Sequence, residues 1–218
     1  RGLGDVYKRQ VIDALRYTAS GEGFTSPELA DIDYVNHRVV TLTCHRRENY
    51  GKPMRNIFEA VRNTALRFPD VIFVYPVHLS PVVREAAGEL LSGLPNLRLI
   101  EPLEAVDMHR LMAKSYMVMT DSGGLQEEAP ALGKPVLVLR RETERPEAVD
   151  AGTVVLAGTE RERIEALAAE LLTDKAAYDR MAHAVNPYGD GRACPRIADA
   201  ICYAFGLSDR RPEEFTAQ

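Results

Sequence analysis

The sequence has few cysteines, no long apolar run and no excess of basic residues, and each absence excludes a class of protein. The three cysteines, Cys44, Cys194 and Cys202, form no CxxC pair and are too dispersed for a zinc site or a disulfide framework. No apolar stretch approaches the roughly 20 residues that span a bilayer, and the first residues lack the basic-then-apolar order of a secretory signal. We therefore expect a cytoplasmic protein that holds no metal and has no membrane partner.

The charge balance excludes a further class of protein. There are 27 Lys and Arg residues against 32 Asp and Glu residues, and the net charge of −5 argues against a general nucleic-acid binder. The 218 residues fit one large domain, or one domain with appended segments, and a hydrophobic content of 45% is ample for its core. Any anion-binding site must therefore be local.

Segments with the apolar pattern of strands alternate with segments of helical periodicity along most of the chain. Strands separated by helices give a parallel sheet that is covered on both faces, with right-handed crossovers. The sequence therefore predicts a Rossmann-like, three-layer α/β domain. The expected strands are residues 39–44, 71–75, 97–100, 116–120, 136–139 and 154–156. The expected helices are residues 11–18, 53–68, 81–91, 105–113, 125–132, 146–150, 160–172, 175–184 and 192–205, and residues 20–36 are expected to be a loop.

Residues 116–146 are the unit around which the rest of the chain is organised: a strand, a turn, a helix and a second strand. In the turn, Asp121 to Gly124, Ser122 is predicted to cap the helix, and two glycines allow another group to approach the backbone closely. A phosphate is the expected ligand, because the first amides of a helix lack partners and its dipole is positive there. Glu128 lies about one turn, roughly 5.4 Å, further along the same face, where a carboxylate suits ribose hydroxyls. The alternative is an ordinary capped helix with surface acids at Glu127 and Glu128.

Polar residues follow several of the expected strands and should gather at one edge of the sheet. Ligands of open α/β sheets bind beyond the carboxyl ends of the strands, and a histidine, arginines and carboxylates together suit a phosphorylated, hydroxylated ligand. Two ordinary alternatives remain: His78 as a loop residue bonded to a backbone carbonyl, and Arg140 to Arg145 as a surface ion-pair network. The polar segments are residues 45–49, 78–81, 101–104, 121–124 and 140–145.

Four motifs, taken together, resemble those of a known family. They are Thr43–Asn49 (TCHRREN), Pro76–Pro81 (PVHLSP), residues 121–140 (DSGGLQEEAPALGKPVLVLR) and Thr143–Glu147 (TERPE). Over residues 11–205 the chain resembles the non-hydrolysing UDP-N-acetylglucosamine 2-epimerases. The resemblance implies two Rossmann-like domains in the GT-B arrangement, with the nucleotide sugar bound between them, and this chain matches the C-terminal domain.

The resemblance implies roles for the residues around the phosphates. His45 is expected to contact the diphosphate and to support catalysis. Ser122, Gly123 and Gly124 are expected to hold phosphate through their backbone amides. Arg145 is expected to supply a cationic contact near the phosphates or the sugar.

Further residues match family positions that contact the nucleoside or a second ligand. Glu128 is expected to hold the ribose, and Leu103 and Met108 match positions that frame the uracil. Arg46 and His78 match the region where some bacterial members bind a second, regulatory UDP-N-acetylglucosamine.

The family's reaction, as the resemblance implies it, interconverts UDP-N-acetylglucosamine and UDP-N-acetylmannosamine. UDP is eliminated to leave a 2-acetamidoglucal, and it then adds back on the other face. Negative charge develops on the leaving diphosphate, so amides and cations aimed at that group stabilise the transition state. No cofactor is implied. The expected partners are UDP or UDP-N-acetylglucosamine, an N-terminal domain whose acidic residues handle the C2 proton, and optionally a second copy in a homodimer.

The resemblance also suggests how the chain is divided. Residues 1–10 do not match the family and are interpreted as a non-native leader. Residues 11–37 are expected to be an interdomain helix and linker, residues 38–206 the UDP-binding domain, and residues 207–218 a tail.

Two other interpretations remain open from the sequence. One is the donor-binding half of a GT-B glycosyltransferase, which shares the architecture and a late Gly/Glu nucleotide motif. The other is a non-catalytic module that binds a nucleotide sugar. The cluster from His45 to Asn49 and the segment Thr143–Glu147 favour the epimerase over the glycosyltransferase.

Overall fold

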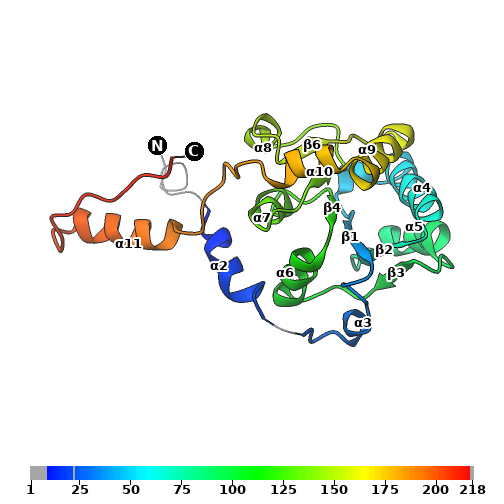
Figure 1. Cartoon of the computed structure of the whole chain (residues 1–218), viewed down its shortest axis with the longest axis horizontal. Coiled ribbons are helices and arrows are strands. Elements are labelled where there is room, and N and C mark those ends of the chain that lie inside the picture. The colour runs from blue at the N-terminus through cyan, green and yellow to red at the C-terminus, as the bar shows by residue number, and fades with distance from the viewer. Residues whose placement is uncertain (1–8, 22, 217–218) are drawn as a thin grey trace.

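The computed structural model describes residues 9–21 and 23–216 and contains a six-stranded sheet whose neighbouring strands are all parallel (Figure 1). The strand order is β3-β2-β1-β4-β5-β6, so the order reverses between β1 and β4. In open α/β sheets a ligand binds at such a reversal, outside the carboxyl ends of the strands. The strands are β1 (Arg38–Thr43), β2 (Val71–Pro76), β3 (Leu97–Ile100), β4 (Met117–Thr120), β5 (Val136–Val138) and β6 (Val154–Leu156).

Helices cover both faces of the sheet, because successive side chains of a strand point to opposite sides and both sides here are apolar. On one side α4 (Lys52–Arg67), α5 (Pro81–Leu91) and α9 (Arg161–Thr173) pack in the cluster that contains Val40 and Met119. On the other side α2 (Gln10–Thr18), α6 (Ala105–Lys114) and α7 (Leu125–Ala131) pack in the clusters that contain Val39 and Val118. The three-layer α/β fold is therefore confirmed. The remaining helices are α3 (Pro27–Ala30), the 3-10 helix η1 (Arg47–Asn49), α8 (Pro146–Asp150), α10 (Lys175–Ala182) and α11 (Ala193–Ala204).

Each expected strand and helix is present with nearly the expected bounds, and three details differ. The expected loop at residues 20–36 contains α3, and the cluster after β1 contains η1. The prediction that Ser122 caps its helix is wrong. Gly124 occupies the N-cap position with a helical backbone, and no side chain caps α7. The Ser122 amide instead donates to Thr120 Oγ1 at 2.9 Å, which ties this residue back to the end of β4.

The N-terminal part of the described chain is anchored to the domain. The Arg9 amide donates to the Tyr188 carbonyl at 3.0 Å, and Gln10 begins α2. Residues 1–8 of the expected leader and residues 217–218 of the expected tail lie outside the described residues. The division of the chain into leader, linker, domain and tail stays a prediction.

Helix α11 extends away from the sheet, and α2 lies between it and the helices α6 and α7 (Figure 1). Asp13 in α2 is buried, and its carboxylate accepts the backbone amides of Ala193 at 3.0 Å and Cys194 at 2.6 Å. These are the first two residues of α11, whose early amides have no partners within the helix. A side chain of one helix therefore caps the start of the other.

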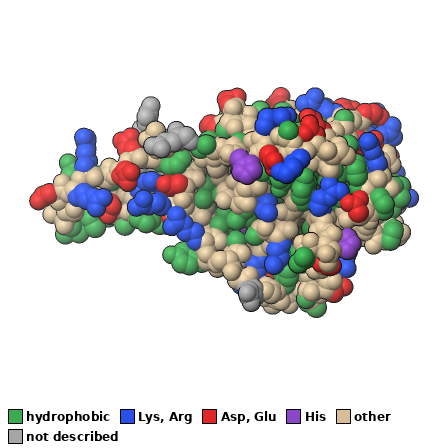
Figure 2. All heavy atoms as spheres, in the orientation of Figure 1, with side chains coloured by type: hydrophobic (Ala, Val, Ile, Leu, Met, Phe, Trp, Pro, Cys, Tyr) green, Lys and Arg blue, Asp and Glu red, His purple; other side chains and the backbone are tan. Residues whose placement is uncertain are grey.

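The surface carries charges of both signs. Figure 2 shows Lys and Arg side chains interspersed with Asp and Glu side chains over the face in view. A cationic site for a ligand must therefore be sought in particular residues.

Within residues 9–21 and 23–216, each helix is too short or too polar to cross a lipid bilayer.

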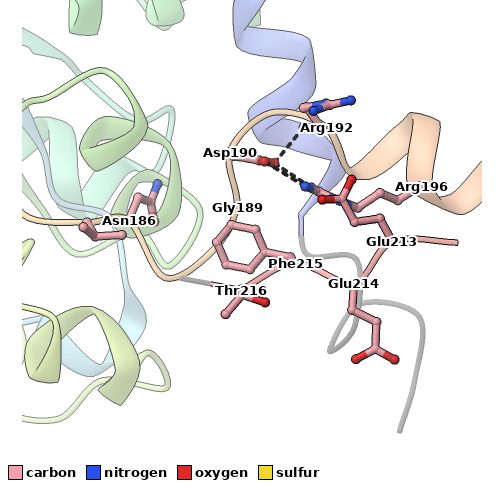
Figure 3. A pocket seen from close by; sticks show the side chains of 10 residues that line it. Asn186, Gly189, Asp190, Arg192, Arg196, Glu213, Glu214, Phe215 and Thr216 are labelled. Carbon is pink, nitrogen blue, oxygen red and sulfur yellow. Dashed lines mark hydrogen bonds and ion pairs between the residues drawn. The ribbon is translucent and has the colours of Figure 1, made fainter. Parts of the chain in front are cut away.

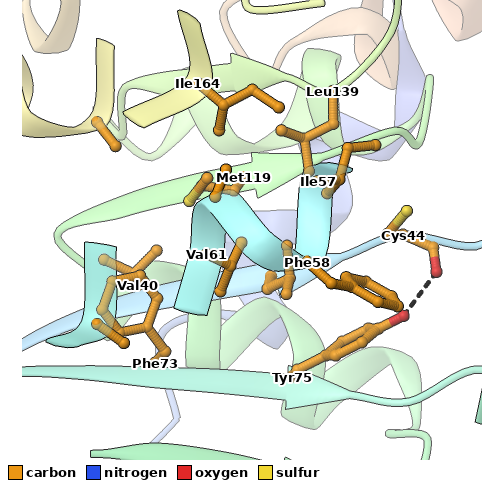
Figure 4. Packing of buried hydrophobic residues seen from close by; sticks show 14 of the residues in the cluster. Val40, Cys44, Ile57, Phe58, Val61, Phe73, Tyr75, Met119, Leu139 and Ile164 are labelled. Carbon is orange, nitrogen blue, oxygen red and sulfur yellow. Dashed lines mark hydrogen bonds between the residues drawn. The ribbon is translucent and has the colours of Figure 1, made fainter. Parts of the chain in front are cut away.

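The carboxyl end of β1 is held from within the core by Tyr75 of β2 (Figure 4). Tyr75 is fully buried, its ring centroid lies 5.7 Å from that of Phe58, and its hydroxyl donates to the Cys44 carbonyl at 2.6 Å. Burial raises the pKa of Tyr75 far above its usual range, so the hydroxyl keeps its proton as a donor. The Cys44 side chain is itself buried.

We expect Tyr75→Phe to lower the free energy of unfolding by about 1–3 kcal/mol, because it leaves the buried Cys44 carbonyl without a donor. The measurement is urea unfolding followed by circular dichroism. Tyr178→Phe is the matched control: its hydroxyl also donates to a backbone carbonyl, that of Tyr116, at 3.0 Å, but from a half-buried position. An equally small loss in both variants would show that water replaces the Tyr75 hydroxyl.

Candidate functional site

A pocket of about 260 Å³ lies where β1, β2 and β4 end, at the reversal of strand order. Leu103, Met108 and Leu125 form an apolar part of its lining, and His45 and His78 contribute polar rings. Of the residues expected at the site, the pocket brings together His45, His78, Leu103, Met108 and Ser122. The lining residues are Thr43, Cys44, His45, Tyr75, Pro76, His78, Pro102, Leu103, Met108, Ser122 and Leu125.

His45 is held between a carboxylate and a second histidine. Its Nδ1 lies 3.2 Å from Oδ1 of Asp121, which is fully buried. Its ring stacks on that of His78, with centroids 5.4 Å apart and planes 16° from parallel. Burial lowers the pKa of His45, Asp121 opposes this, and the nearby His78 and Arg46 add to the lowering. The net direction favours a neutral imidazole near pH 7.

His78 is bound locally as well as stacked. Its Nδ1 accepts the amide of Ser80 at 3.1 Å, so His78 is bonded to its own loop, but to an amide and not to the backbone carbonyl that the loop alternative expected. The same ring also lines the pocket. The two interpretations of this histidine are therefore compatible.

Backbone amides are available in the turn after β4. Within the described chain, the amides of Gly123 and Gly124 donate to no protein acceptor. A Cβ atom at Gly123 would lie 3.0 Å from a Glu144 carboxylate oxygen, and one at Gly124 would lie 3.4 Å from a Glu128 carboxylate oxygen. These glycines therefore allow the turn to pass close to two acidic side chains while its amides stay open to a ligand.

Glu128 contacts a histidine that the sequence analysis did not single out. His109 Nε2 lies 3.4 Å from Glu128 Oε2, and both side chains are largely buried. The other ring nitrogen, Nδ1, is 2.8 Å from Thr18 Oγ1 in α2. The alternative of a surface acid at position 128 is therefore wrong. In the sequence, the available signal was a histidine directly after Met108 in the expected helix 105–113.

Glu127 is also buried, and it pairs with Arg145. Arg145 Nε contacts Glu127 Oε1, and Arg9 Nε lies 3.4 Å from Glu127 Oε2. The Arg145 amide donates to Thr143 Oγ1 at 3.1 Å, which fixes the backbone at the start of α8. Arg145 is thus anchored beside α7, outside the lining of the pocket. The alternative of a surface acid at position 127 is wrong.

The expected ion-pair network at residues 140–145 is confirmed in part. Arg140, largely buried, donates through Nε to Glu48 at 2.6 Å and contacts Glu144 through Nη1. Arg46 Nη2 lies 3.2 Å from the other Glu144 oxygen. A backbone hydrogen bond and the two arginines hold the pKa of Glu144 below its usual value. The cations nearest the Ser-Gly-Gly turn are therefore already paired with carboxylates.

A larger cavity, of about 430 Å³, lies elsewhere, between the segment before α11 and the tail (Figure 3). One of its two arginines, Arg196, donates to both carboxylate oxygens of Asp190 at 2.6 and 2.9 Å, and Glu213 and Glu214 add acidic groups. It has none of the strand-end residues, so the smaller pocket is the candidate site. In the part of the chain that the structure describes, no three His, Cys, Asp or Glu residues gather as a metal site requires.

Comparison with known proteins gives a consistent result. The sequence profile described as UDP-N-acetylglucosamine 2-epimerase matches residues 9–202. The chain is 51% identical over 207 residues to the UDP-N-acetylglucosamine 2-epimerase of Bacillus subtilis, covering 95% of this chain and 54% of that protein. The S. aureus MnaA–UDP structure superposes with a TM-score of 0.89 at 44% identity, covering 96% of this chain and 57% of that one. UDP-GlcNAc 2-epimerase from Neisseria meningitidis, bound to UDP-GlcNAc, gives a TM-score of 0.83 at 42% identity, covering 89% and 54%. The chain thus spans about half the length of these relatives.

We expect Glu127→Gln to lower the free energy of unfolding by about 1–3 kcal/mol, because Arg145 then loses the charge of a buried partner. Urea unfolding measures the loss. Glu160→Gln is the control, since Glu160 pairs with Arg141 at 3.4 Å with both side chains mostly exposed, and such pairs contribute less than about 1 kcal/mol. Equal losses in the two variants would mean that Arg145 is not anchored by Glu127.

Proposed function

The chain belongs to the UDP-N-acetylglucosamine 2-epimerase family, and on that premise we propose that this domain is the half that holds the UDP of the nucleotide sugar. The observation that carries the proposal is the pocket at the reversal of strand order. That pocket combines an apolar lining with two histidine rings beside a turn with open amides. Relatives described as bound to UDP and to UDP-GlcNAc support the choice of ligand.

In this proposal the nucleotide lies across the carboxyl ends of β1 and β4. Leu103 and Met108 frame the uracil, because they supply apolar surface beside the pocket's polar groups. Glu128 accepts from the ribose hydroxyls, since a largely buried carboxylate is a strong acceptor there. The nucleoside therefore runs from the apolar lining towards α7.

The diphosphate lies over the turn. The amides of Gly123 and Gly124 face it, whereas the expected contact from the Ser122 amide is dropped because that amide donates to Thr120 Oγ1. Arg145 supplies positive charge from the start of α8. His45 contacts the diphosphate from the end of β1. These groups bind most strongly when charge develops on the leaving UDP, so they favour the elimination step over the bound ground state.

The reaction in this proposal is elimination of UDP and its re-addition to the other face of a 2-acetamidoglucal. This half retains UDP between the two steps, and the acidic residues of an N-terminal domain remove and return the C2 proton. Epimerisation then requires both halves, because a general base must be within hydrogen-bond reach of the proton it takes. The proposed second, regulatory site at Arg46 and His78 stays a prediction, although His78 lines the pocket.

The family assignment decides against one of the two alternative functions and not against the other. The family to which the chain belongs is the epimerase family, so the donor-binding half of a glycosyltransferase is set aside. A non-catalytic module that binds a nucleotide sugar would use the same pocket and would differ only in catalysis. The two experiments below separate binding from catalysis.

We expect Glu128→Ala to weaken UDP binding by about 1.5–3 kcal/mol, or roughly 10- to 150-fold, because a charged hydrogen-bond acceptor is lost. Isothermal titration calorimetry measures the binding of UDP and of 2′,3′-dideoxy-UDP to the wild type and to the variant. The removal of the two ribose hydroxyls takes the place of the second mutation in a double-mutant cycle. If Glu128 holds the ribose, the variant loses affinity for UDP and no longer distinguishes the two ligands. Glu160→Ala is the control at an exposed position. Unchanged discrimination would contradict the assignment of the ribose to Glu128.

We expect the 218-residue chain alone to bind UDP but to form no UDP-N-acetylmannosamine from UDP-N-acetylglucosamine. Its sheet is covered on both faces and needs no further domain to complete its core, whereas the groups that handle the C2 proton are expected elsewhere. The measurement follows the anomeric proton signals by NMR. Appearance of the mannosamine product would contradict this division of labour, and absence of UDP binding would contradict the proposed function itself.

A further inference from the structure

Asp121, the first residue after β4, holds the whole loop that follows β1. Its side chain is fully buried. Oδ2 accepts the backbone amides of His45 and Arg46, each at 2.8 Å, and Asn49 Nδ2 at 3.1 Å. Asn49 also donates to the Leu139 carbonyl at 3.1 Å, so the contacts extend to the end of β5. One carboxylate oxygen therefore satisfies three donors of the loop that carries His45.

The second oxygen of Asp121 has a different environment. Oδ1 is buried and receives no well-aligned hydrogen bond from the described residues. His45 Nδ1 lies 3.2 Å from it. A buried carboxylate oxygen without a donor is unfavourable, and a proton on Nδ1 supplies that donor after a small rotation of the ring.

Of the other charged and titratable groups nearby, Arg46 and His78 are bonded elsewhere, and Cys44 contacts the same carboxylate through a thiol that keeps its proton. The Arg46 guanidinium is directed to Glu144, 3.2 Å away. His78 stacks face to face on His45, and its Nδ1 is occupied by the Ser80 amide. The Cys44 thiol is buried beside Asp121, and burial together with that carboxylate raises its pKa. His45 is therefore the group whose protonation state Asp121 controls.

We infer that Asp121 is the positioning residue of His45, holding the imidazole proton on Nδ1 and leaving Nε2 as a bare acceptor for the pocket. The catalytic meaning of this inference rests on the proposed function. A neutral His45 in this state accepts one proton at Nε2, and the resulting imidazolium keeps its Nδ1–H on Asp121. That proton comes from water: the imidazolium donates from Nε2 in a hydrogen bond to an anionic group and gives the proton back to water when it becomes neutral again, so the protons balance.

The test uses the 15N-labelled 218-residue chain and long-range 1H–15N correlation spectra of its histidine rings from pH 5 to 9. Because free histidine prefers the proton on Nε2, a proton on Nδ1 of His45 is diagnostic. Comparison with a His45→Gln sample assigns the ring signals. We expect His45 to carry its neutral-state proton on Nδ1.

The decisive variant is Asp121→Asn, which keeps the shape of the side chain. Its amide oxygen can still accept from the loop, and its NH₂ group then faces His45 Nδ1. We expect the neutral ring to change to the Nε2–H tautomer and the pKa of His45 to fall by about one unit or more, because an opposite charge within hydrogen-bond distance is lost.

Asp13→Asn is the matched control. Asp13 is also buried and accepts two backbone amides, those of Ala193 and Cys194, at the junction of α2 and α11. We expect it to leave the tautomer and the pKa of His45 unchanged. A change equal to that of Asp121→Asn would mean that general loosening of the domain, rather than Asp121, moves the ring.

Two results overturn the inference: a wild-type His45 with its proton on Nε2, or an Asp121→Asn variant with the wild-type tautomer and pKa. Should Asp121→Asn not fold, as backbone 1H–15N spectra will reveal, the tautomer of the wild-type ring decides alone. UDP titrations on the same samples keep the two proposals apart. A wild-type chain that has the Nδ1–H tautomer but binds no UDP contradicts the proposed function and leaves the positioning role intact.

Discussion

The parallel pairing of β1 with β4 is the constraint on which the rest of this structure depends. It aligns Thr43 with Thr120, and the two hydroxyls lie 2.6 Å apart at the last pair of the register. The Asp121 amide then donates to the Thr43 carbonyl at 3.2 Å. Because the strand order reverses at this pair, no crossover helix fills the space beyond it. Two chain segments more than seventy residues apart therefore leave the sheet together and define one side of the pocket.

Charge at this edge is arranged in pairs, which fits a chain with a net charge of −5. Arg145 and Arg140 each face a carboxylate, while the amides of Gly123 and Gly124 face no acceptor among the described residues. An arriving anion would thus meet uncharged donors first. Buried pairs of this kind also limit rearrangement, since separating either partner leaves an uncompensated charge in a region of low dielectric.

The sheet and helices were predictable from the sequence because the evidence for them is local. Apolar runs in β1 and β4 and the helical spacing in α4 occur within short windows, so the strands and helices follow the expected bounds closely. The error at Ser122 was also local in origin: the pattern identified a good capping residue, but Thr120 bonds its amide and moves the helix start to Gly124.

Contacts within the site were less predictable, because they join residues distant in the chain. The motifs contain His45 and Ser122, the family resemblance added Leu103 and Met108, and the structure brings these four together. No sequence pattern indicated that Asp121 would hold the loop after β1. Hydrogen bonds between segments so far apart in the chain depend on how the strands are ordered in space, and one sequence without its fold does not specify that order.

The contact between His109 and Glu128 connects helix α2 with helix α7 through polar side chains. Thr18 at the end of α2, His109 in α6 and Glu128 in α7 form a continuous line of polar contacts at 2.8 and 3.4 Å. A ligand that bonds Glu128 competes with His109 for the same carboxylate, and the imidazole in turn shares its other nitrogen with α2. If such a ligand binds more tightly when α2 is in one position, then ligand binding shifts α2 towards that position by the same free energy. The chain of contacts from Thr18 through His109 to Glu128 is the route by which α2 and such a ligand would affect each other.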